Sequence, residues 1–241
     1  MPGELDGRIG NEVGRRAENV AQWYFRLNGF LLIPSFVLHP DNEEPYALTD
    51  VDILGVRFPH SRERIGDRDM EDDPLLLQLA HECQTLFVMV ESKANEGCKL
   101  NGAWKQPERG NMQRAIRRLG FATESSVDSI AKSMYHSLRW EDDRYVLQYV
   151  CIGRVSSPDY CRTYPDLVQL TWDNVADFLF SRFEKFPEKL PTGQTVHQQW
   201  PRFGRGFGSR FRSMRSNDDA RKTVKDYIET GWGTHHHKEP L

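Results

Sequence analysis

Apolar positions along the chain fall into short runs and amphipathic stretches. Residues 10–28 place an apolar side chain every three or four positions, which predicts a helix that stops at Gly29. Continuous apolar runs predict strands at 30–38, 50–58, 85–93, 144–153 and 167–172. Helical spacing returns at 111–120, 127–138 and 173–186. This order predicts an α/β fold with a mixed central sheet flanked by helices.

Two segments lack a clear apolar pattern. Residues 59–73 are rich in charge and predict a solvated insertion, which the run at 74–83 extends with a helical turn or two. After Pro187, proline, glycine, glutamine and arginine dominate, and apolar spacing returns only around 220–228. We therefore expect one domain over residues 8–188, followed by an irregular, flexible C-terminal tail over 189–241.

Composition narrows the class of protein. The chain has 241 residues, of which 28% are charged and 38% apolar, and no apolar run is long enough to cross a bilayer. The first residues carry no basic and apolar pattern of a secretory signal. The four cysteines show no tight pairing, so we expect reduced thiols, a cytoplasmic location and no membrane contact. The net charge of -3 means that any nucleic-acid-binding face must come from local clustering.

The apolar run at 85–93 ends in charged residues. In "FVMVESKA", Glu91 and Lys93 are two positions apart and therefore share one face of a strand. One interpretation is an ion pair at the point where the strand leaves the core. The other is half of a metal-dependent active site, which would need a second carboxylate.

The preceding strand supplies that carboxylate. "TDVDILG" places Asp50 and Asp52 on one face, and Asp52 stands where the apolar run begins. Sequential strands are usually neighbours, so Asp52 can meet Glu91. Two adjacent carboxylates repel each other unless a cation joins them, and Mg²⁺, with Mn²⁺ as a substitute, prefers such oxygen ligands. Lys93 could then orient or deprotonate a water or stabilise the phosphate, whereas Asp50 is expected to be a solvated acid.

These residues resemble the Asp…Glu-x-Lys signature of the PD-(D/E)XK nuclease superfamily, whose fold is restriction-endonuclease-like. The helix at 14–30 is also similar to the first helix of Holliday-junction resolvases and related small nucleases. The resemblance covers roughly residues 10–120. It implies a glutamate near the metal at Glu18 and a polar residue near the site at Gln113. Without it, Glu18 would be an exposed helix-face carboxylate and Gln113 an ordinary polar helix residue.

The chain departs from the superfamily pattern in two ways. The proline that usually precedes the first aspartate is absent. The insertion at 59–83 is longer than the tight hairpin of many relatives, although it does not touch the motif. A bare Asp…Glu-x-Lys is also a weak signal, and its strength here comes from its place at the ends of two apolar runs.

The function expected from these features is metal-dependent hydrolysis of phosphodiester bonds, with DNA as the expected substrate and the choice between DNA and RNA left open. Asp52 and Glu91 would hold Mg²⁺, with the Ser92 carbonyl as a backbone ligand and Glu18 as a further carboxylate. Cutting both strands of a duplex would favour a homodimer. Two alternatives stay open: a non-catalytic nucleic-acid-binding module that retains the nuclease fold, and a structural protein in which Glu91 and Lys93 form only an ion pair.

The tail contains a second candidate surface. The stretch "RFGRGFGSRFRSMR" has no acid and five arginines, which are Arg202, Arg205, Arg210, Arg212 and Arg215. Phenylalanines alternate with them, at Phe203, Phe207 and Phe211. Arginine with aromatic residues suits phosphate contact and base stacking, so we expect this stretch to bind nucleic acid. The alternative is an arginine-rich linker.

Overall fold

The computed structural model describes residues 3–40, 49–187 and 210–232, with side chains from residue 12 onward. The chain forms two compact units. One contains Glu18–Thr171, and the other contains the flanking segments Met1–Ala17 and Trp172–Leu241. Helix α1 (Gly3–Leu27) begins earlier than the sequence pattern predicts and runs through both units.

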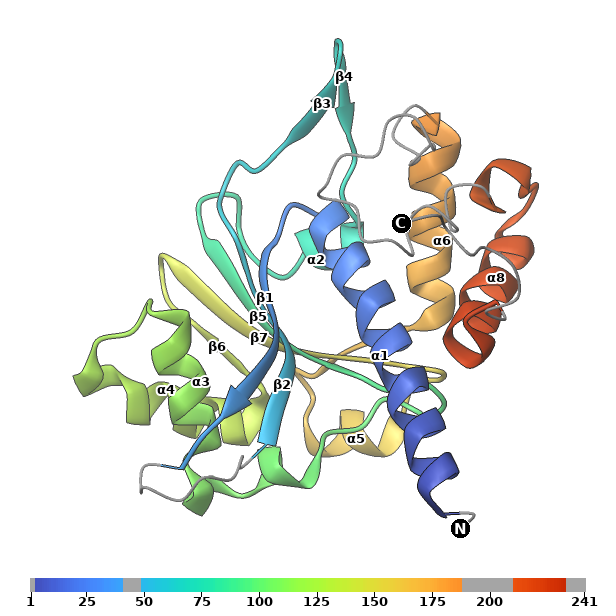
Figure 1. The fold of residues 1–241 in the computed structure, drawn as a ribbon. Helices are drawn as coiled ribbons and strands as arrows, with labels where there is room; N and C mark the ends of the chain where they lie inside the picture. Colours follow the sequence, from blue (N-terminus) through green and yellow to red (C-terminus); the bar gives the residue numbers. More distant parts are fainter. Residues whose placement is uncertain (1–2, 41–48, 188–209, 233–241) are drawn as a thin grey trace, which may run out of the picture. The chain divides into compact units, whose positions relative to one another are not determined.

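A mixed sheet forms the centre of the unit Glu18–Thr171 (Figure 1). Its strands are β1 (Leu31–Leu38), β2 (Thr49–Arg57), β5 (Thr85–Ser92), β7 (Tyr145–Gly153), β6 (Arg139–Glu141) and β8 (Val168–Thr171). Their order is β1-β2-β5-β7-β6, and β8 also pairs with β7. The pairs of β5 and β8 with β7 are parallel, and the other pairs are antiparallel. The predicted α/β architecture with a mixed central sheet flanked by helices is therefore confirmed.

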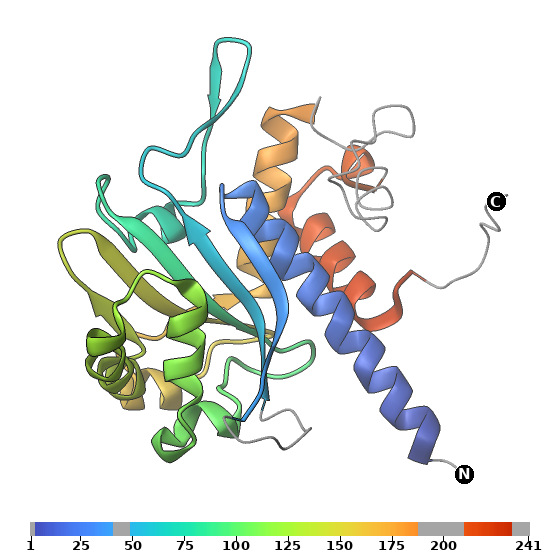
Figure 2. The ribbon, with the colours of Figure 1, turned by 60° about the vertical axis from the view of Figure 1, so that its left-hand side comes forward.

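Helices cover both faces of this sheet (Figures 1 and 2). Helices α3 (Asn111–Leu119) and α4 (Glu124–Ser137) lie on one face, and residues 18–27 of α1 lie on the other. On the α3/α4 face, alternate strand residues such as Phe87, Met89 and Tyr149 are buried with apolar side chains of both helices. The face that holds Glu91, two positions beyond Met89, is thus the α3/α4 face.

The predicted solvated insertion contains regular structure. Strands β3 (Glu63–Ile65) and β4 (Arg68–Met70) form a hairpin that extends away from the main sheet (Figures 1 and 2). Gly66 has φ +59° at its turn, a conformation that glycine adopts readily. The sequence pattern does not reveal this hairpin because its two strands are short and four of their six residues are charged. The predicted helical turn follows as α2 (Pro74–Leu77).

The segment between β5 and α3 packs closely against β7. It contains two short 3-10 helices, η1 (Gly102–Lys105) and η2 (Pro107–Arg109). At Gly153 an added Cβ would lie 2.7 Å from the Cys98 nitrogen, so only glycine permits this approach. The Cys98 N–H donates to the Val155 carbonyl at 2.9 Å, beyond the end of β7. A short helix, α5 (Pro158–Thr163), then leads to β8.

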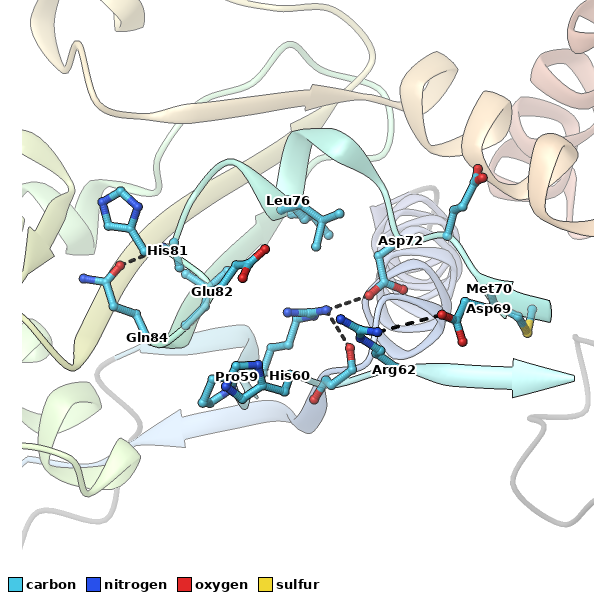
Figure 3. Close-up of a pocket in the computed structure, with 16 residues that line it drawn as sticks. Pro59, His60, Arg62, Asp69, Met70, Asp72, Leu76, His81, Glu82 and Gln84 are labelled. Atoms are coloured by element: carbon cyan, nitrogen blue, oxygen red, sulfur yellow. Dashed lines mark hydrogen bonds and ion pairs between the residues drawn. The ribbon is translucent and has the colours of Figure 1, made fainter. Parts of the chain in front are cut away.

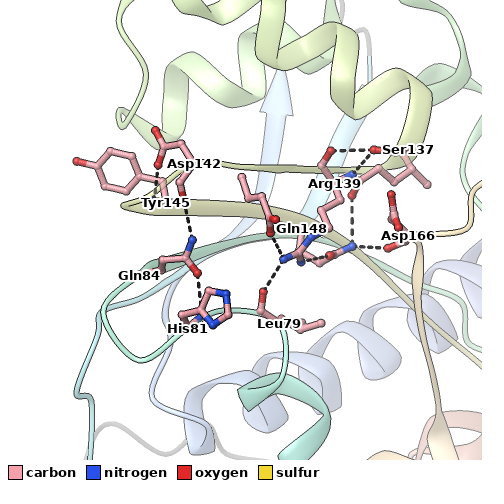
Figure 4. A network of polar contacts seen from close by, with 11 residues as sticks. Leu79, His81, Gln84, Ser137, Arg139, Asp142, Tyr145, Gln148 and Asp166 are labelled. Carbon is pink, nitrogen blue, oxygen red and sulfur yellow. Dashed lines mark hydrogen bonds and ion pairs between the residues drawn. The ribbon is translucent and has the colours of Figure 1, made fainter.

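A partly buried polar network links β6 and β7 to the segments that precede β5 and β8 (Figure 4). Arg139 donates to the Gln148 side-chain oxygen at 2.9 Å, and Gln148 donates to the Asp166 carbonyl at 2.8 Å. Gln84 donates to the Asp142 carbonyl at 2.6 Å. These bonds join β6, β7 and the segments before β5 and β8, so their role is structural.

The second unit contains helices from both ends of the chain. In it, α6 (Trp172–Lys185) and α8 (Asn217–Thr230) are joined by the ion pairs Asp177–Arg221 at 2.6 Å and Asp173–Lys225 at 2.8 Å. The prediction of an irregular tail is therefore wrong over α8. Its buried residues recur at helical spacing, at Ala220, Val224, Tyr227 and Ile228, and Ser216 caps its start.

The predicted nucleic-acid-binding stretch of the tail lies partly outside the described residues, which exclude Arg202, Arg205, Phe203 and Phe207. Phe211 is only 5% exposed and packs edge-on against Phe183, at 5.7 Å between ring centroids. It is a core residue, so its predicted role in base stacking is wrong. The guanidinium of Arg210 lies 4.5 Å from the centre of the Trp232 ring. Binding by the tail arginines and the domain boundary after residue 188 stay predictions.

Two further observations bear on the class of protein. No helix among the described residues is long and apolar enough to cross a membrane. All four cysteines are free thiols, with Cys98 and Cys151 buried and Cys83 and Cys161 exposed.

Candidate active site

The candidate site lies where β2 begins and β5 ends. These strands pair antiparallel, and Ile53 is the partner of Val90. One position further along this register, Asp52 lies opposite Glu91. Both carboxylates belong to the α3/α4 face, because Asp52 alternates with Leu54 and Glu91 with Met89 in that core. The predicted neighbourhood of the two strands is confirmed.

Asp52 is held by the residue that follows Glu91. The Ser92 N–H donates to Asp52 Oδ2 at 2.7 Å, and the Ser92 hydroxyl donates to the same oxygen at 2.9 Å. The Asp52 residue is only 8% exposed. Burial raises the pKa of this carboxyl, the two Ser92 bonds lower it, and the charge of Asp50 raises it further. The net effect is a raised pKa, so the ionised form is costly.

Glu91 is the more strongly perturbed acid. It is 1% exposed, and its Oε1 accepts from Lys93 Nζ at 2.5 Å while its Oε2 accepts from the Tyr149 hydroxyl at 3.3 Å. Burial is the main cause that raises the pKa of Glu91 from 4.5 to about 7, and the nearby charge of Asp52 adds to it. Lys93 and Tyr149 offset part of this rise. One ammonium therefore does not compensate for two buried carboxylates.

Lys93 is fixed between two oxygen acceptors. Besides Glu91, its Nζ donates to Asn101 Oδ1 at 2.8 Å. Burial lowers the pKa of the Lys93 ammonium, but the adjacent Glu91 carboxylate raises it, and the net direction is upward. Lys93 therefore keeps its proton at neutral pH.

Sequence reasoning missed two members of the site. Asn101 lies in the segment after β5, and Tyr149 lies on β7, where its ring is wholly buried. Tyr149 pairs with Met89 across the parallel β5–β7 ladder, so this pairing brings it beside Glu91. An alternation rule could have placed Tyr149 on a core-facing side of its strand, but no local pattern marks Asn101.

The other predicted site residues stand as follows. Asp50 is exposed, as expected for a solvated acid. Glu18 is half-buried on α1 and is not among the groups that dominate the pKa values of Asp52 and Glu91. Gln113 lies in the first turn of α3, and its Oε1 is buried with no hydrogen-bond partner in the described part of the chain. Their roles, and that of the Ser92 carbonyl, stay predictions.

The donor set fits a hard cation with few protein ligands. Among the described residues, no group of three or more His, Cys, Asp or Glu side chains is arranged to hold a metal ion. The adjacent pair Asp52 and Glu91 nevertheless provides two carboxylates. Mg²⁺ is commonly held by one or two carboxylates together with waters and substrate phosphate, so the pair is sufficient for it.

A separate pocket of about 380 Å³ lies at the opposite end of the β2–β5 ladder (Figure 3). Its central cation, Arg57, donates to Asp72 Oδ2 at 2.7 Å and to the Ser61 carbonyl at 3.0 Å. Arg62 lies 3.9 Å from Asp69 in a more exposed pair. Because Arg57 is already compensated in this way, the pocket offers no comparable reactive set.

No protein-family model, no curated protein and no solved structure matches the chain.

Proposed function

We propose that the chain is a Mg²⁺-dependent nuclease of the PD-(D/E)XK type that hydrolyses phosphodiester bonds, with DNA as the expected substrate. The observation that carries the proposal is the pairing of Asp52 and Glu91 at the ends of adjacent strands, with Lys93 at 2.5 Å from Glu91. A restriction-endonuclease-like version of the α/β fold, with a cytoplasmic location, is part of this proposal.

Electrostatics favour a cation at this pair. Two buried carboxylates that face each other cannot both ionise cheaply, and the pKa of Glu91, about 7, records that cost. A divalent cation would remove the cost by balancing both charges. Within the described part of the chain, every hydrogen bond to Asp52 falls on Oδ2, which leaves Oδ1 available as a ligand.

The protein's own groups have separate tasks in this proposal. Ser92 orients Asp52 through its N–H and hydroxyl. Bound Mg²⁺ would supply positive charge against the phosphate oxygens and acidify an attacking water. Lys93 keeps its proton, because its pKa is raised, so it acts by charge against the developing negative phosphate rather than as the base. The sequence alone does not decide whether Lys93 acts on the attacking water or stabilises the phosphate.

The ion-pair alternative accounts for less of the site. It explains the contact between Lys93 and Glu91, but it does not require Asp52. A structural pair would be more stable without a second buried carboxylate that raises the pKa of Glu91. The binding-module alternative has the same site geometry as the nuclease but lacks catalytic activity. A cleavage assay therefore decides between the nuclease and the binding module.

The test is incubation of the full chain with single-stranded, duplex, flapped and junction DNA and with RNA, in Mg²⁺, Mn²⁺, Ca²⁺ or EDTA. Cleavage in Mg²⁺ and Mn²⁺, its absence in EDTA, and its loss in Glu91→Gln would support the proposal. Glu82→Gln is the matched control, because Glu82 is an exposed acid outside the site. Cleavage that persists in Glu91→Gln would overturn the assignment.

A further inference from the structure

We propose that the basic segment, residues 99–118, is the surface on which the phosphodiester backbone of the substrate lies, with Lys105 and Arg109 contacting phosphates next to the one that is cleaved. The inference rests on the proposed function, to which it adds the substrate-binding surface. It assigns binding to the catalytic unit itself, whereas the sequence pattern points to the arginines of the tail.

The charge of the basic segment differs from that of the chain. It contains one acid, Glu108, and six bases, which are Lys99, Lys105, Arg109, Arg114, Arg117 and Arg118. The whole chain has a net charge of -3. Local positive charge of this kind is what attracts a phosphate backbone, since each phosphate contact releases bound counterions.

Contacts place the basic segment directly against the catalytic residues. Asn101 Oδ1 accepts from Lys93 Nζ at 2.8 Å. Two residues later, the Ala103 carbonyl accepts from Asn111 Nδ2 at 3.0 Å, which ties η1 to the start of α3. Asn111 is fully buried. A phosphate held at Lys93 therefore has η1 and the start of α3 as its immediate surroundings.

Some bases of the segment already have partners. Arg117 contacts both oxygens of Glu124, with Nε at 3.0 and 3.1 Å. The guanidinium of Arg118 lies 5.3 Å from the centre of the Phe36 ring. Lys99 pairs with Glu96 at 2.6 Å, although both side chains are about half exposed. These three bases are weaker candidates for substrate contact.

The Lys105 side chain and the Arg109 backbone are held by hydrogen bonds, and neither side chain is neutralised by a described acid. Lys105 Nζ donates to the Tyr160 hydroxyl at 2.5 Å and lies 4.8 Å from the centre of that ring. The Arg109 carbonyl accepts from Arg114 Nη1 at 2.5 Å, at the turn where Gly110 has φ +65°. Both residues are exposed, and neither forms an ion pair with another described residue. They can therefore exchange solvent for phosphate oxygens at little cost.

The experiment measures binding in a full-length Asp52→Asn background, so that cleavage does not interfere. Lys105→Ser/Arg109→Ser is compared with Lys132→Ser/Arg144→Ser, which removes the same charge from exposed positions on α4 and before β7. Fluorescence anisotropy follows a labelled duplex and its single strand at several salt concentrations in EDTA. Thermal unfolding verifies that each variant is folded.

We expect the Lys105/Arg109 variant to bind about tenfold or more weakly at moderate salt, and its log–log salt slope to fall by about two. The control should keep the affinity and slope of the background protein. Equal losses in both variants, no loss in either, or no binding by the background protein would each overturn the inference.

Cleavage assays separate this inference from the proposed function. If the wild-type chain cleaves and Lys105→Ser/Arg109→Ser cleaves equally well at low substrate concentration, the inferred substrate-binding surface is wrong and the proposed nuclease function is kept. If Lys105 and Arg109 control binding but the wild-type chain does not cleave, the nucleic-acid-binding surface is kept and the proposed nuclease function is wrong.

Discussion

The β2–β5 ladder carries charged groups at both ends, and the two ends are built differently. At the end near Arg57, the Arg57 guanidinium donates to Asp72 at 2.7 Å, and its Nε donates to the Asn28 carbonyl at 3.1 Å. Asp73 accepts from the Tyr24 hydroxyl at 2.7 Å and from the Leu75 N–H at 2.9 Å. Each acid there has a donor of its own.

At the other end, two acids depend on one ammonium. Within the described residues, the hydrogen bonds to Asp52 come from Ser92. Glu91 accepts from the Tyr149 hydroxyl and from Lys93, which also donates to Asn101. The pKa values of both carboxyls are raised, that of Glu91 to about 7. Both carboxylates accept hydrogen bonds, but the raised pKa values show that their buried charges are not balanced, which points to a cation as the missing ligand. The comparison separates a structural cluster from a candidate active site on the same two strands.

The largest difference between the two ends should appear in Glu91→Gln. The substitution removes one of two proposed metal ligands and should lower cleavage by about a thousandfold or more, equivalent to about 4 kcal/mol. It also removes an unfavourable buried charge, so the thermal stability of the metal-free protein at pH 8 should not fall. Initial cleavage rates and a melting curve on the same preparation measure both quantities.

The reverse pattern is expected at the other end. Arg57→Ala removes the guanidinium that lies 2.7 Å from the largely buried Asp72 carboxylate and should lower the free energy of unfolding by about 3 kcal/mol. Cleavage per folded molecule should stay within about twofold, because Arg57 lies at the opposite end of the ladder. Urea unfolding and rates corrected for the folded fraction provide the test. A loss of activity as large as that of Glu91→Gln would remove the distinction between the ends.

The pH dependence of the metal-free protein follows from Glu91. Its pKa is raised from 4.5 to about 7 on folding, so the native state binds this proton more tightly than the unfolded state does. The stabilisation is complete below about pH 4.5 and is lost as the pH rises through about 7, by roughly 3 kcal/mol in total. Melting temperatures in EDTA should show a larger loss in wild type than in Glu91→Gln, in which only Asp52 of the pair keeps a raised pKa. A wild-type curve identical to that of the variant would contradict the assigned pKa.

The smallest effect is expected for Tyr149→Phe. The hydroxyl bond to Glu91 is long, at 3.3 Å, and it lowers the pKa of Glu91 only in part. Its removal should move the midpoint of the pH dependence upward and reduce cleavage by less than about tenfold. The same melting series in EDTA measures the midpoint. A downward shift would show that the phenol does not stabilise the ionised carboxylate.

Much of the frame of this site could be predicted from the sequence. Apolar runs that begin at Asp52 and end at Glu91 identify both strands, and the neighbourhood of sequential strands brings the two carboxylates together. Lys93 follows from the alternation of side chains along a strand. These inferences succeed because they depend on local periodicity and on the pairing of β2 with β5, which the long insertion between them does not prevent.

The remaining features depend on contacts that the local sequence does not encode. Asn101 reaches Lys93 only because the segment after β5 folds back against β7, and Tyr149 reaches Glu91 through parallel pairing. The many charged residues of the β3–β4 hairpin obscure the alternation that would predict two strands. The arginine- and glycine-rich stretch before α8 likewise favours the prediction of an irregular tail over that of a helix. The same composition predicts base stacking for Phe211, but this side chain is buried against Phe183.

The most direct test of the central claim is the rate of DNA cleavage by the full chain as Mg²⁺ is titrated, in wild type and Glu91→Gln side by side. The account predicts saturable, Mg²⁺-dependent cleavage by wild type, none in EDTA, and none above background in the variant at any concentration. Cleavage by both proteins with the same Mg²⁺ dependence, or by neither on any of the DNA and RNA substrates, would contradict it.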